Sequence, residues 1–284
     1  MVLGAIGYLK GQMKSVALLT DSSACLPLEL TARSDIGILP IRSHLRSEDI
    51  ADGTPGASER VYQALAQGEP VKSTAPTAFE YLTAIEEARS EAVVVVTPAV
   101  EFTGMYRNAA VAAEISGRPA VVVDSRTAAA AQGLVVLAAW EAARTGASVE
   151  EVVAVARDAA ARAELVAALK SVEFIERSGR VGPLALGLAR QLGIHPVFRL
   201  SDGAVERLGV PRSHEAVLNR IRKEAQARGF GTASRAMIFH AARADDARRL
   251  EDRLGVSGPV TEFSPSMGIH TGPGVIGVAW LRSS

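Results

Sequence analysis

Residues 77–125 decide the fold, and they read TAFEYLTAIEEARSEAVVVVTPAVEFTGMYRNAAVAAEISGRPAVVVDS. Two short apolar runs in this stretch, at residues 92–96 and 120–123, lack the alternation of polar and apolar residues that a half-exposed strand shows. Between them, residues 104–116 follow Thr103 with the pattern of an amphipathic helix. A helix between two fully apolar strands predicts a parallel sheet that crossover helices bury on both faces.

The same alternation continues on both sides of this stretch. Further strands are expected at residues 16–19 and 36–41. Helices are expected at residues 59–67 after Ser58, from a capping box of Thr77 and Glu80, at 127–145, and from a second capping box of Ser148 and Glu151 to about Arg162. The sequence therefore predicts a loose extension at residues 1–14 and an α/β/α parallel-sheet domain at residues 15–162.

The rhythm changes after residue 162. Extended segments at residues 195–200 and 204–210 flank Asp202-Gly203, and Asp-Gly between strands is a strong hairpin signal. Further strands are expected at residues 165–169, 236–240, 260–263 and 275–281, and helices at residues 213–228 and 244–254. Antiparallel pairing implies a second α/β domain at residues 163–284 with a mixed, largely antiparallel sheet.

Composition excludes several classes of protein. The chain has 284 residues with 31 Lys plus Arg and 31 Asp plus Glu, and this zero net charge, with 5% aromatic residues, argues against nucleic acid as a partner. The single cysteine, Cys25, has no disulfide partner in the chain and predicts a reducing, cytoplasmic setting. The longest weakly polar run, residues 127–140, is shorter than the roughly 20 residues that a membrane span needs.

Small polar residues follow the expected strands of the first domain. Ligands of open α/β sheets bind at the carboxyl ends of the strands. The candidates there are Thr20, Asp21, Ser22 and Ser23, then Thr97, then Asp124 and Ser125, with Ser73 and Thr74 just before the cap Thr77. Their hydroxyls could hold a carboxylate or phosphate, but Ser and Thr also cap helices at such places, and both interpretations stay open.

A glycine-rich segment near the end of the chain is a second candidate. Gly272, Gly274 and Gly277 match GxGxxG, but the match leads into a strand rather than a helix, so it does not indicate a dinucleotide site. We expect a tight loop that brings His270 and Thr271 to a crevice, with an ordinary glycine turn as the alternative. Upstream, Arg180 is either a forked donor to an anion or a surface arginine at the start of a helix.

Signatures of well-known catalytic sites are absent from the sequence. It contains no HExxH, Walker A, GxSxG or EF-hand pattern. The five histidines show no metal-ligand spacing, and Cys25 has no sequence evidence of a paired base. We therefore predict neither a metal nor a cofactor, and interpret Cys25 as a core thiol.

Short sequence pieces recur in a fixed order between about Ser15 and Leu281. They are TDSSA at residues 20–24, LPI at 39–41, KSTAPT at 72–77, FTGMYRNA at 102–109, VDS at 123–125, SGRV at 178–181, LGIHPV at 192–197, PR at 211–212 and HTGPG at 270–274. Each piece is weak alone, but their shared order is specific. Taken together, they resemble the DegV family, whose characterised members are bacterial fatty-acid-binding proteins.

The resemblance implies a non-catalytic protein that encloses a long-chain fatty acid as its ligand, with the carboxylate at the domain interface. It also implies a partner, the catalytic subunit of a fatty acid kinase, which converts the ligand to an acyl phosphate for phospholipid synthesis, with transient contact at the membrane surface. Carboxylate contacts carry over onto Ser73, Thr74, His270 and the adjacent Thr271. Arg180 carries over as a residue of the entrance or of the kinase-docking face.

Two positions depart from the family pattern. Ala99-Val100 stand where the family has a Ser pair, so a hydroxyl expected at the carboxylate is missing and Thr97 or Thr103 becomes the candidate for its role. His195 replaces a lysine, which removes a permanent positive charge. The alternative function that the strand-end hydroxyls leave open is an enzyme acting on a small phosphorylated or carboxylated metabolite. A purely regulatory module is the fallback.

Overall fold

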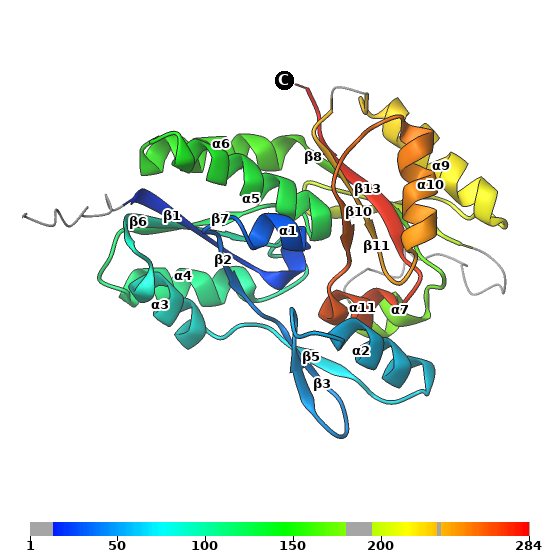
Figure 1. Cartoon of the computed structure of the whole chain (residues 1–284), viewed down its shortest axis with the longest axis horizontal. Helices are drawn as coiled ribbons and strands as arrows, with labels where there is room; N and C mark the ends of the chain where they lie inside the picture. The colour runs from blue at the N-terminus through cyan, green and yellow to red at the C-terminus, as the bar shows by residue number, and fades with distance from the viewer. Residues whose placement is uncertain (1–13, 180–194, 232–233, 284) are drawn as a thin grey trace, which may run out of the picture.

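The computed structural model describes residues 14–179, 195–231 and 234–283, which form two large sheets and one small sheet (Figure 1). Sheet A is parallel, and its order is β2 (Gly37–Leu39), β1 (Lys14–Asp21), β6 (Ser90–Thr97) and β7 (Ala120–Asp124). The four strands lie where the sequence predicts them. β2 is shorter than expected, because the chain leaves sheet A after Leu39 and joins the small sheet.

Helices cover both faces of sheet A, which explains its continuous apolar runs. Val93 and Val95 face α3 (Ala78–Glu87) and α4 (Met105–Ile115). Val94 and Val96 point the other way, toward α5 (Ala129–Arg144) and α6 (Val149–Arg162). Both predicted capping boxes are present, at the starts of α3 and α6.

Sheet C is mixed, as the sequence predicts. Its order is β10 (Ala204–Gly209), β9 (Val197–Ser201), β8 (Ala163–Ala168), β13 (Ile276–Leu281), β11 (Ala236–His240) and β12 (Val260–Glu262). All pairs are antiparallel except β11 with β12. The turn between β9 and β10 holds Asp202 and Gly203 at φ values of 49° and 73°, the left-handed conformations that a two-residue hairpin loop uses.

The two faces of sheet C have different covers. On one face, α9 (His214–Ala227) and α10 (Ala244–Leu254) bury side chains such as Ile238 and Trp280. The opposite face packs against α5, which also lies on sheet A. Gly133 of α5 lets the helix approach the segment that follows β1, because a Cβ there would lie 2.5 Å from the carbonyl oxygen of Ala24. The largest apolar core therefore runs through both sheets.

A third, antiparallel sheet lies at the bottom of Figure 1, where the sequence predicts no sheet. Its order is β4 (Asp49–Ala51), β3 (Arg42–His44) and β5 (Lys72–Thr74). Around it lie α2 (Ala57–Ala66), α11 (Pro265–Thr271) and α7 (Glu173–Ser178). Two short segments, η1 (Ser22–Ala24) and α1 (Leu28–Thr31), follow β1. α11, which lies near the C-terminal end of the sequence, thus packs against elements from the first half of the chain.

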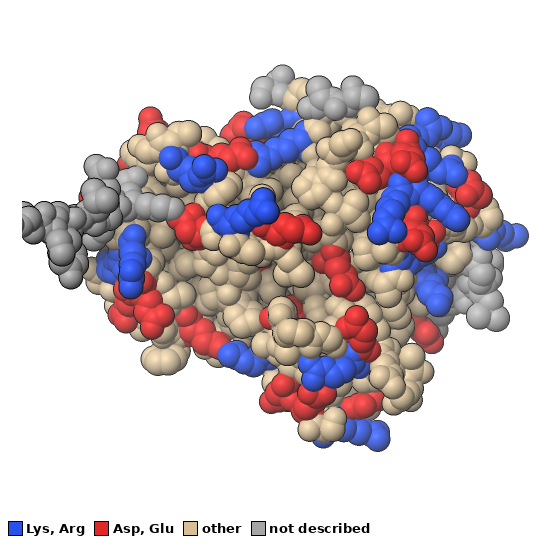
Figure 2. All heavy atoms as spheres, viewed as in Figure 1, with Lys and Arg blue, Asp and Glu red and all other residues tan. Residues whose placement is uncertain are grey.

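The surface carries both charges without segregating them. Figure 2 shows basic and acidic side chains interspersed over the face in view, in keeping with the zero net charge. Within the described ranges, none of the helices is both long and apolar enough to cross a membrane. The division of the chain at residue 163 stays a prediction, although α6 ends and β8 begins there.

Candidate ligand-binding site

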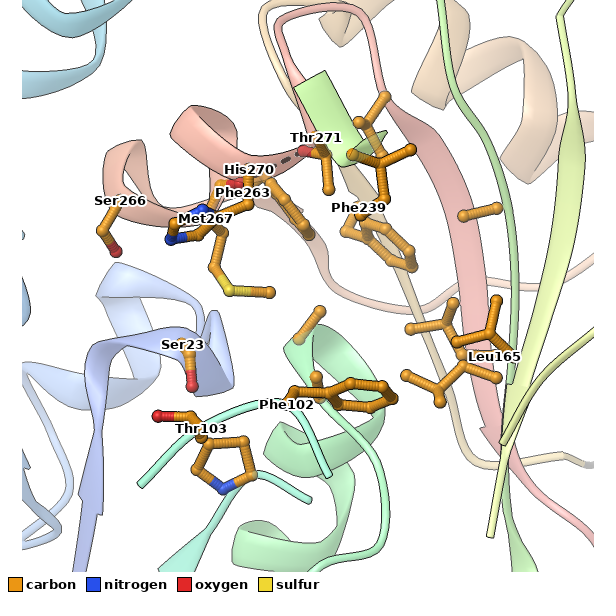
Figure 3. A pocket seen from close by; sticks show the side chains of 18 of the residues that line it. Ser23, Phe102, Thr103, Leu165, Phe239, Phe263, Ser266, Met267, His270 and Thr271 are labelled. Atoms are coloured by element: carbon orange, nitrogen blue, oxygen red, sulfur yellow. Dashed lines mark hydrogen bonds between the residues drawn. The ribbon is translucent and has the colours of Figure 1, made fainter. Parts of the chain in front are cut away.

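A cavity of about 320 Å³ lies between sheet C, the loops that follow β6 and β7, and α11. Most of its wall is apolar, contributed by Leu165, Ala167, Phe198, Leu200, Phe239 and Phe263 among others. Hydroxyl and imidazole groups also line it, from Ser23, Ser73, Thr103, Ser266, His270 and Thr271. Figure 3 shows Ser23, Thr103, Ser266 and His270 on one side of the cavity and Leu165 and Phe239 on the other. The cavity therefore has a polar end and an apolar remainder.

The polar end joins two segments that are far apart in the sequence. Ser73 lies in β5, and its Oγ is 2.8 Å from Nε2 of His270 in the last turn of α11. Pro265 starts this helix, and Gly272, at φ 77°, ends it. Gly268 lets α11 approach α2, because a Cβ at this position would collide with the ring of Tyr62. The helix therefore fixes the direction of the His270 imidazole.

The expected loop around His270 and Thr271 is wrong, because both residues belong to α11 and the glycine turn only begins after them. The helix was missed since it has seven residues, includes Gly268 and packs mainly through contacts with α2 and α7. Thr271 lines the cavity, but its Oγ1 donates to the Met267 carbonyl oxygen at 3.2 Å. Its hydroxyl is thus already used within the helix.

The other predicted residues divide into two groups. Thr103 lines the same cavity as Ser73 and His270. Thr74 does not, since adjacent residues of a strand face opposite sides, and its Oγ1 lies 2.6 Å from Nε2 of His44. Thr97 is fully buried beneath the cavity wall, and its Oγ1 makes no hydrogen bond within the described residues. Arg180 lies outside the described residues.

Behind the polar end lies a network of two acids that the sequence did not bring together. Ser266 Oγ and Ser22 Oγ both donate to Asp52 Oδ2, and the Ser266 amide donates to Asp52 Oδ1 at 3.1 Å. On the other side, Ser23 Oγ contacts Asp21 Oδ1 and lies 2.9 Å from Gln132 Oε1. Asp21 and Ser23 stand at a strand end, where sequence analysis looks for ligands, whereas Asp52 and Ser266 carry no motif.

Burial changes the acidity of both carboxyl groups. Loss of water raises the pKa of Asp21 to about 6, although hydrogen bonds from Ser23 and Gln132 oppose this effect. Burial also raises the pKa of Asp52, against the hydrogen bonds from Ser266 and Ser22. Neither carboxyl has an ion-pair partner in the part of the chain that the structure describes. Among the described residues, two buried carboxyl groups without a basic partner, Asp21 and Asp52, therefore lie behind the polar end of the cavity.

The one arginine among the described lining residues is neutralised by a neighbour. Arg199 donates from Nε and Nη2 to the two carboxylate oxygens of Glu164, both at 2.7 Å. These hydrogen bonds raise the pKa of Arg199 further.

Cys25 is a core thiol as expected, and burial raises its pKa to about 12. Within the described ranges, no group of three or more His, Cys, Asp or Glu side chains is placed to hold a metal ion.

The two departures from the family pattern lie away from the cavity lining. Ala99 is fully buried, and its neighbour Pro98 lines the cavity in its place. His195 lies outside the cavity, and partial burial, with Arg243 and His214 nearby, lowers its pKa. Of the two residues expected to replace the missing hydroxyl, Thr103 lines the cavity and Thr97 does not.

Two sheets that share a buried helix, with a cavity of ligand size beside them, define an α/β protein with a candidate internal binding site. The family model described as "Uncharacterised protein, DegV family" matches residues 15–283, and the chain belongs to this family. A DegV domain-containing protein of Streptomyces coelicolor is 30% identical over 274 residues, which is 93% of this chain and 98% of the relative.

Solved structures agree on the fold. A DegV family protein from Thermus thermophilus, whose structure is described for its fatty acid binding, superposes with a TM-score of 0.88 at 25% identity. The match covers 95% of this chain and all of that one. The DegV protein of Bacillus subtilis, described as a fatty acid binding protein, gives a TM-score of 0.82 at 21% identity, with 95% and 100% coverage. The predicted fold class and family are thus confirmed.

Proposed function

We propose that this protein binds a long-chain fatty acid, with the tail in the apolar cavity and the carboxyl group beside Ser73, Thr103 and His270. The observation that carries this proposal is a cavity with an apolar wall and its polar groups gathered at one end. An elongated molecule with one polar end has the same distribution. The described fatty acid binding of the Thermus thermophilus relative supports the proposal.

The tail supplies most of the affinity in this proposal. Each methylene removed from water contributes about 0.8 kcal/mol, so a chain of about 16 carbons gains roughly 12 kcal/mol before ordering costs. The head group then needs only to be positioned. The hydroxyl of Ser73 and the imidazole of His270 can do this through hydrogen bonds.

The finer part of the proposal follows from the family resemblance. The protein presents the bound carboxyl group to the catalytic subunit of a fatty acid kinase, which forms an acyl phosphate for phospholipid synthesis, with transient contact at the membrane surface. Phosphoryl transfer depends mainly on positioning and charge stabilisation, so the kinase can supply the nucleotide and magnesium. In this scheme the protein itself is not the catalyst.

The apolar wall counts against the alternative of an enzyme for a small phosphorylated or carboxylated metabolite. Such a ligand would use Ser73 and His270 but would leave Leu165, Phe198 and Phe239 without a partner. A metabolite site would also be expected to carry a basic side chain free to pair with the anion, whereas Arg199 is held by Glu164.

Mass spectrometry of the purified protein tests the proposal. Native spectra followed by denaturing spectra should show that a fatty acid leaves when the protein unfolds. A protein without lipid that also fails to take up added palmitate would overturn the proposal. Release of a small polar metabolite would favour the alternative.

A further inference from the structure

The hydrogen bonds around Ser23 require more protons than an ionised Asp21 allows. Ser23 Oγ lies in hydrogen-bond contact with two oxygens, Asp21 Oδ1 and Gln132 Oε1, but it has only one proton to donate. The Gln132 amide nitrogen lies 3.2 Å from Asp21 Oδ2 and also 3.2 Å from Thr20 Oγ1. Thr20 uses its own proton on the Val96 carbonyl oxygen. If Asp21 is ionised, either the contact between Ser23 Oγ and Asp21 Oδ1 or the contact between Ser23 Oγ and Gln132 Oε1 therefore lacks a proton.

Turning the Gln132 amide over does not remove the deficit. The amide nitrogen would then donate to Ser23 Oγ, and Ser23 would donate to Asp21. However, Gln132 Oε1 would face Asp21 Oδ2 at the same 3.2 Å, with no proton between them. With the amide nitrogen facing Asp21 Oδ2 and Thr20 Oγ1, a proton on the Asp21 carboxyl group satisfies every contact, because Asp21 donates to Ser23 and Ser23 donates to Gln132. With the amide turned over, a proton on Asp21 Oδ2 supplies the contact with Gln132 Oε1, and only the contact with Thr20 Oγ1 lacks a proton. The geometry therefore favours a neutral Asp21.

The neighbouring acid has the opposite character. Asp52 accepts three hydrogen bonds, from Ser22 Oγ, Ser266 Oγ and the Ser266 amide, as a carboxylate does. The other titratable groups that act on Asp21 or face the polar end are Cys25 after η1, Tyr81 on α3 and His270 on α11. Ser23 contacts Asp21, and Ser266 contacts Asp52. Both serine side chains line the cavity, so each acid is one hydrogen bond away from a bound ligand.

We propose that the fatty acid carboxylate binds together with a proton held on Asp21, so that ligand affinity is coupled to pH through this residue. The inference rests on the proposed function. A carboxylate at the polar end is a second negative charge beside Asp52, and a third if Asp21 is ionised. The proton on Asp21 removes one of these charges and completes the hydrogen bonds of Ser23.

The sign of the effect follows from linkage. Asp21 in the free protein has a pKa of about 6, and a bound carboxylate raises this value further. Affinity is therefore complete below pH 6 and falls as pH rises above it, by about tenfold per pH unit up to the pKa of the complex. Between pH 6 and the pKa of the complex, each ligand that binds takes up a proton from solvent.

The test compares laurate with 1-dodecanol, which has the same chain length and no charge, on protein freed of lipid. Calorimetry between pH 6 and pH 8 should show weakening laurate binding and constant dodecanol binding. Asp21→Asn, which is neutral at every pH, should bind laurate with the same affinity within about twofold across this range. Asp124→Asn is the matched control, since Asp124 also ends a strand of sheet A, β7, but does not line the cavity.

The outcomes separate the two proposals. Laurate binding that is independent of pH in the wild type, or an unchanged slope in Asp21→Asn, would overturn the inference and leave the proposed function standing. Failure of laurate to bind at any pH would overturn both. Should Asp21→Asn not fold, proton uptake by the wild type in buffers of different ionisation enthalpy serves instead, together with His270→Gln. Nearly one proton per laurate at pH 7.5, retained in His270→Gln, supports the inference, and uptake lost in that variant overturns it.

Discussion

Replacing Ser73 by Ala removes the hydroxyl that faces His270 and leaves the apolar wall of the cavity intact. A neutral hydrogen bond of this kind contributes about 0.5–1.5 kcal/mol net, which corresponds to a loss of affinity of about 2- to 13-fold. The tail keeps its contribution of about 0.8 kcal/mol per methylene. We therefore expect Ser73→Ala to retain its fatty acid through purification.

Acyl phosphate formation by the kinase partner should suffer more than binding does. A displacement of about 1 Å at a reacting atom can cost about 100-fold in rate, since the attacking oxygen must be in line with the phosphoryl group. We expect the rate for Ser73→Ala to fall by about this factor at saturating ligand. Trapping the acyl phosphate with hydroxylamine and measuring the hydroxamate gives the rate.

Thr74→Ala is the matched control, because this hydroxyl is the next along β5 and bonds to His44 away from the cavity. It should stay within about twofold of the wild type in both assays. Binding and rate falling by the same factor in Ser73→Ala would refute the division between a tail that binds and a head group that is positioned. Equal effects of Ser73→Ala and Thr74→Ala would refute the assignment of the polar end.

Three further substitutions test the cavity and its frame. Ala167→Leu adds about three carbons to the wall and should weaken palmitate binding by about 60-fold, at about 0.8 kcal/mol per displaced methylene, with a smaller effect on laurate in the same competition assay. Glu164→Gln removes the buried charged partner of Arg199, whose side chain is 28% exposed, and should lower the free energy of unfolding in urea by about 2 kcal/mol. Gly268→Ala forces α11 away from Tyr62, so the melting temperature and palmitate affinity should both fall, with about 1–3 kcal/mol lost in stability.

Two of these variants have matched controls, and the third is judged by comparing two ligands. Glu206→Gln removes a more exposed partner of Arg199, 3.5 Å away, and should change stability by less than about 0.5 kcal/mol. Gly104→Ala meets no atom within 4 Å and should leave both the melting temperature and palmitate binding near those of the wild type. Equal weakening of laurate and palmitate by Ala167→Leu would mean that the tail does not reach this wall.

Sheets A and C could be predicted because the pattern of apolar residues in their strands indicates which faces of each sheet are buried. The run Val93–Val96 is apolar throughout since helices lie on both sides, and Asp202-Gly203 marks the hairpin of sheet C. The small sheet has no such pattern in the sequence, because its strands are three residues long and include polar segments such as KST at residues 72–74. The sheet packs against α2, which lies between β4 and β5 in the sequence, and against α11, which comes from the distant C-terminal part of the chain.

The sequence predicted that hydroxyl groups and a histidine would line the candidate site, but it did not predict which of the candidate residues do so. Ser73 and Thr74 are equivalent in the sequence, and only the register of β5 decides that one faces the cavity and the other faces His44. Thr97 ends its strand as expected but points into the packed interior. Ser266 and Asp52 meet only after the chain has folded, 214 residues apart, so no local pattern could have joined them.

α5 has a consequence for how the molecule loses its structure. Its side chains are buried from both directions, by sheet A and by sheet C, and most of the helix is out of contact with water. Melting either half would expose one flank of this helix and remove the support of the other half. The halves on the two sides of α5 should consequently unfold in one cooperative transition, and a chain divided after α6 should yield no independently stable fragment.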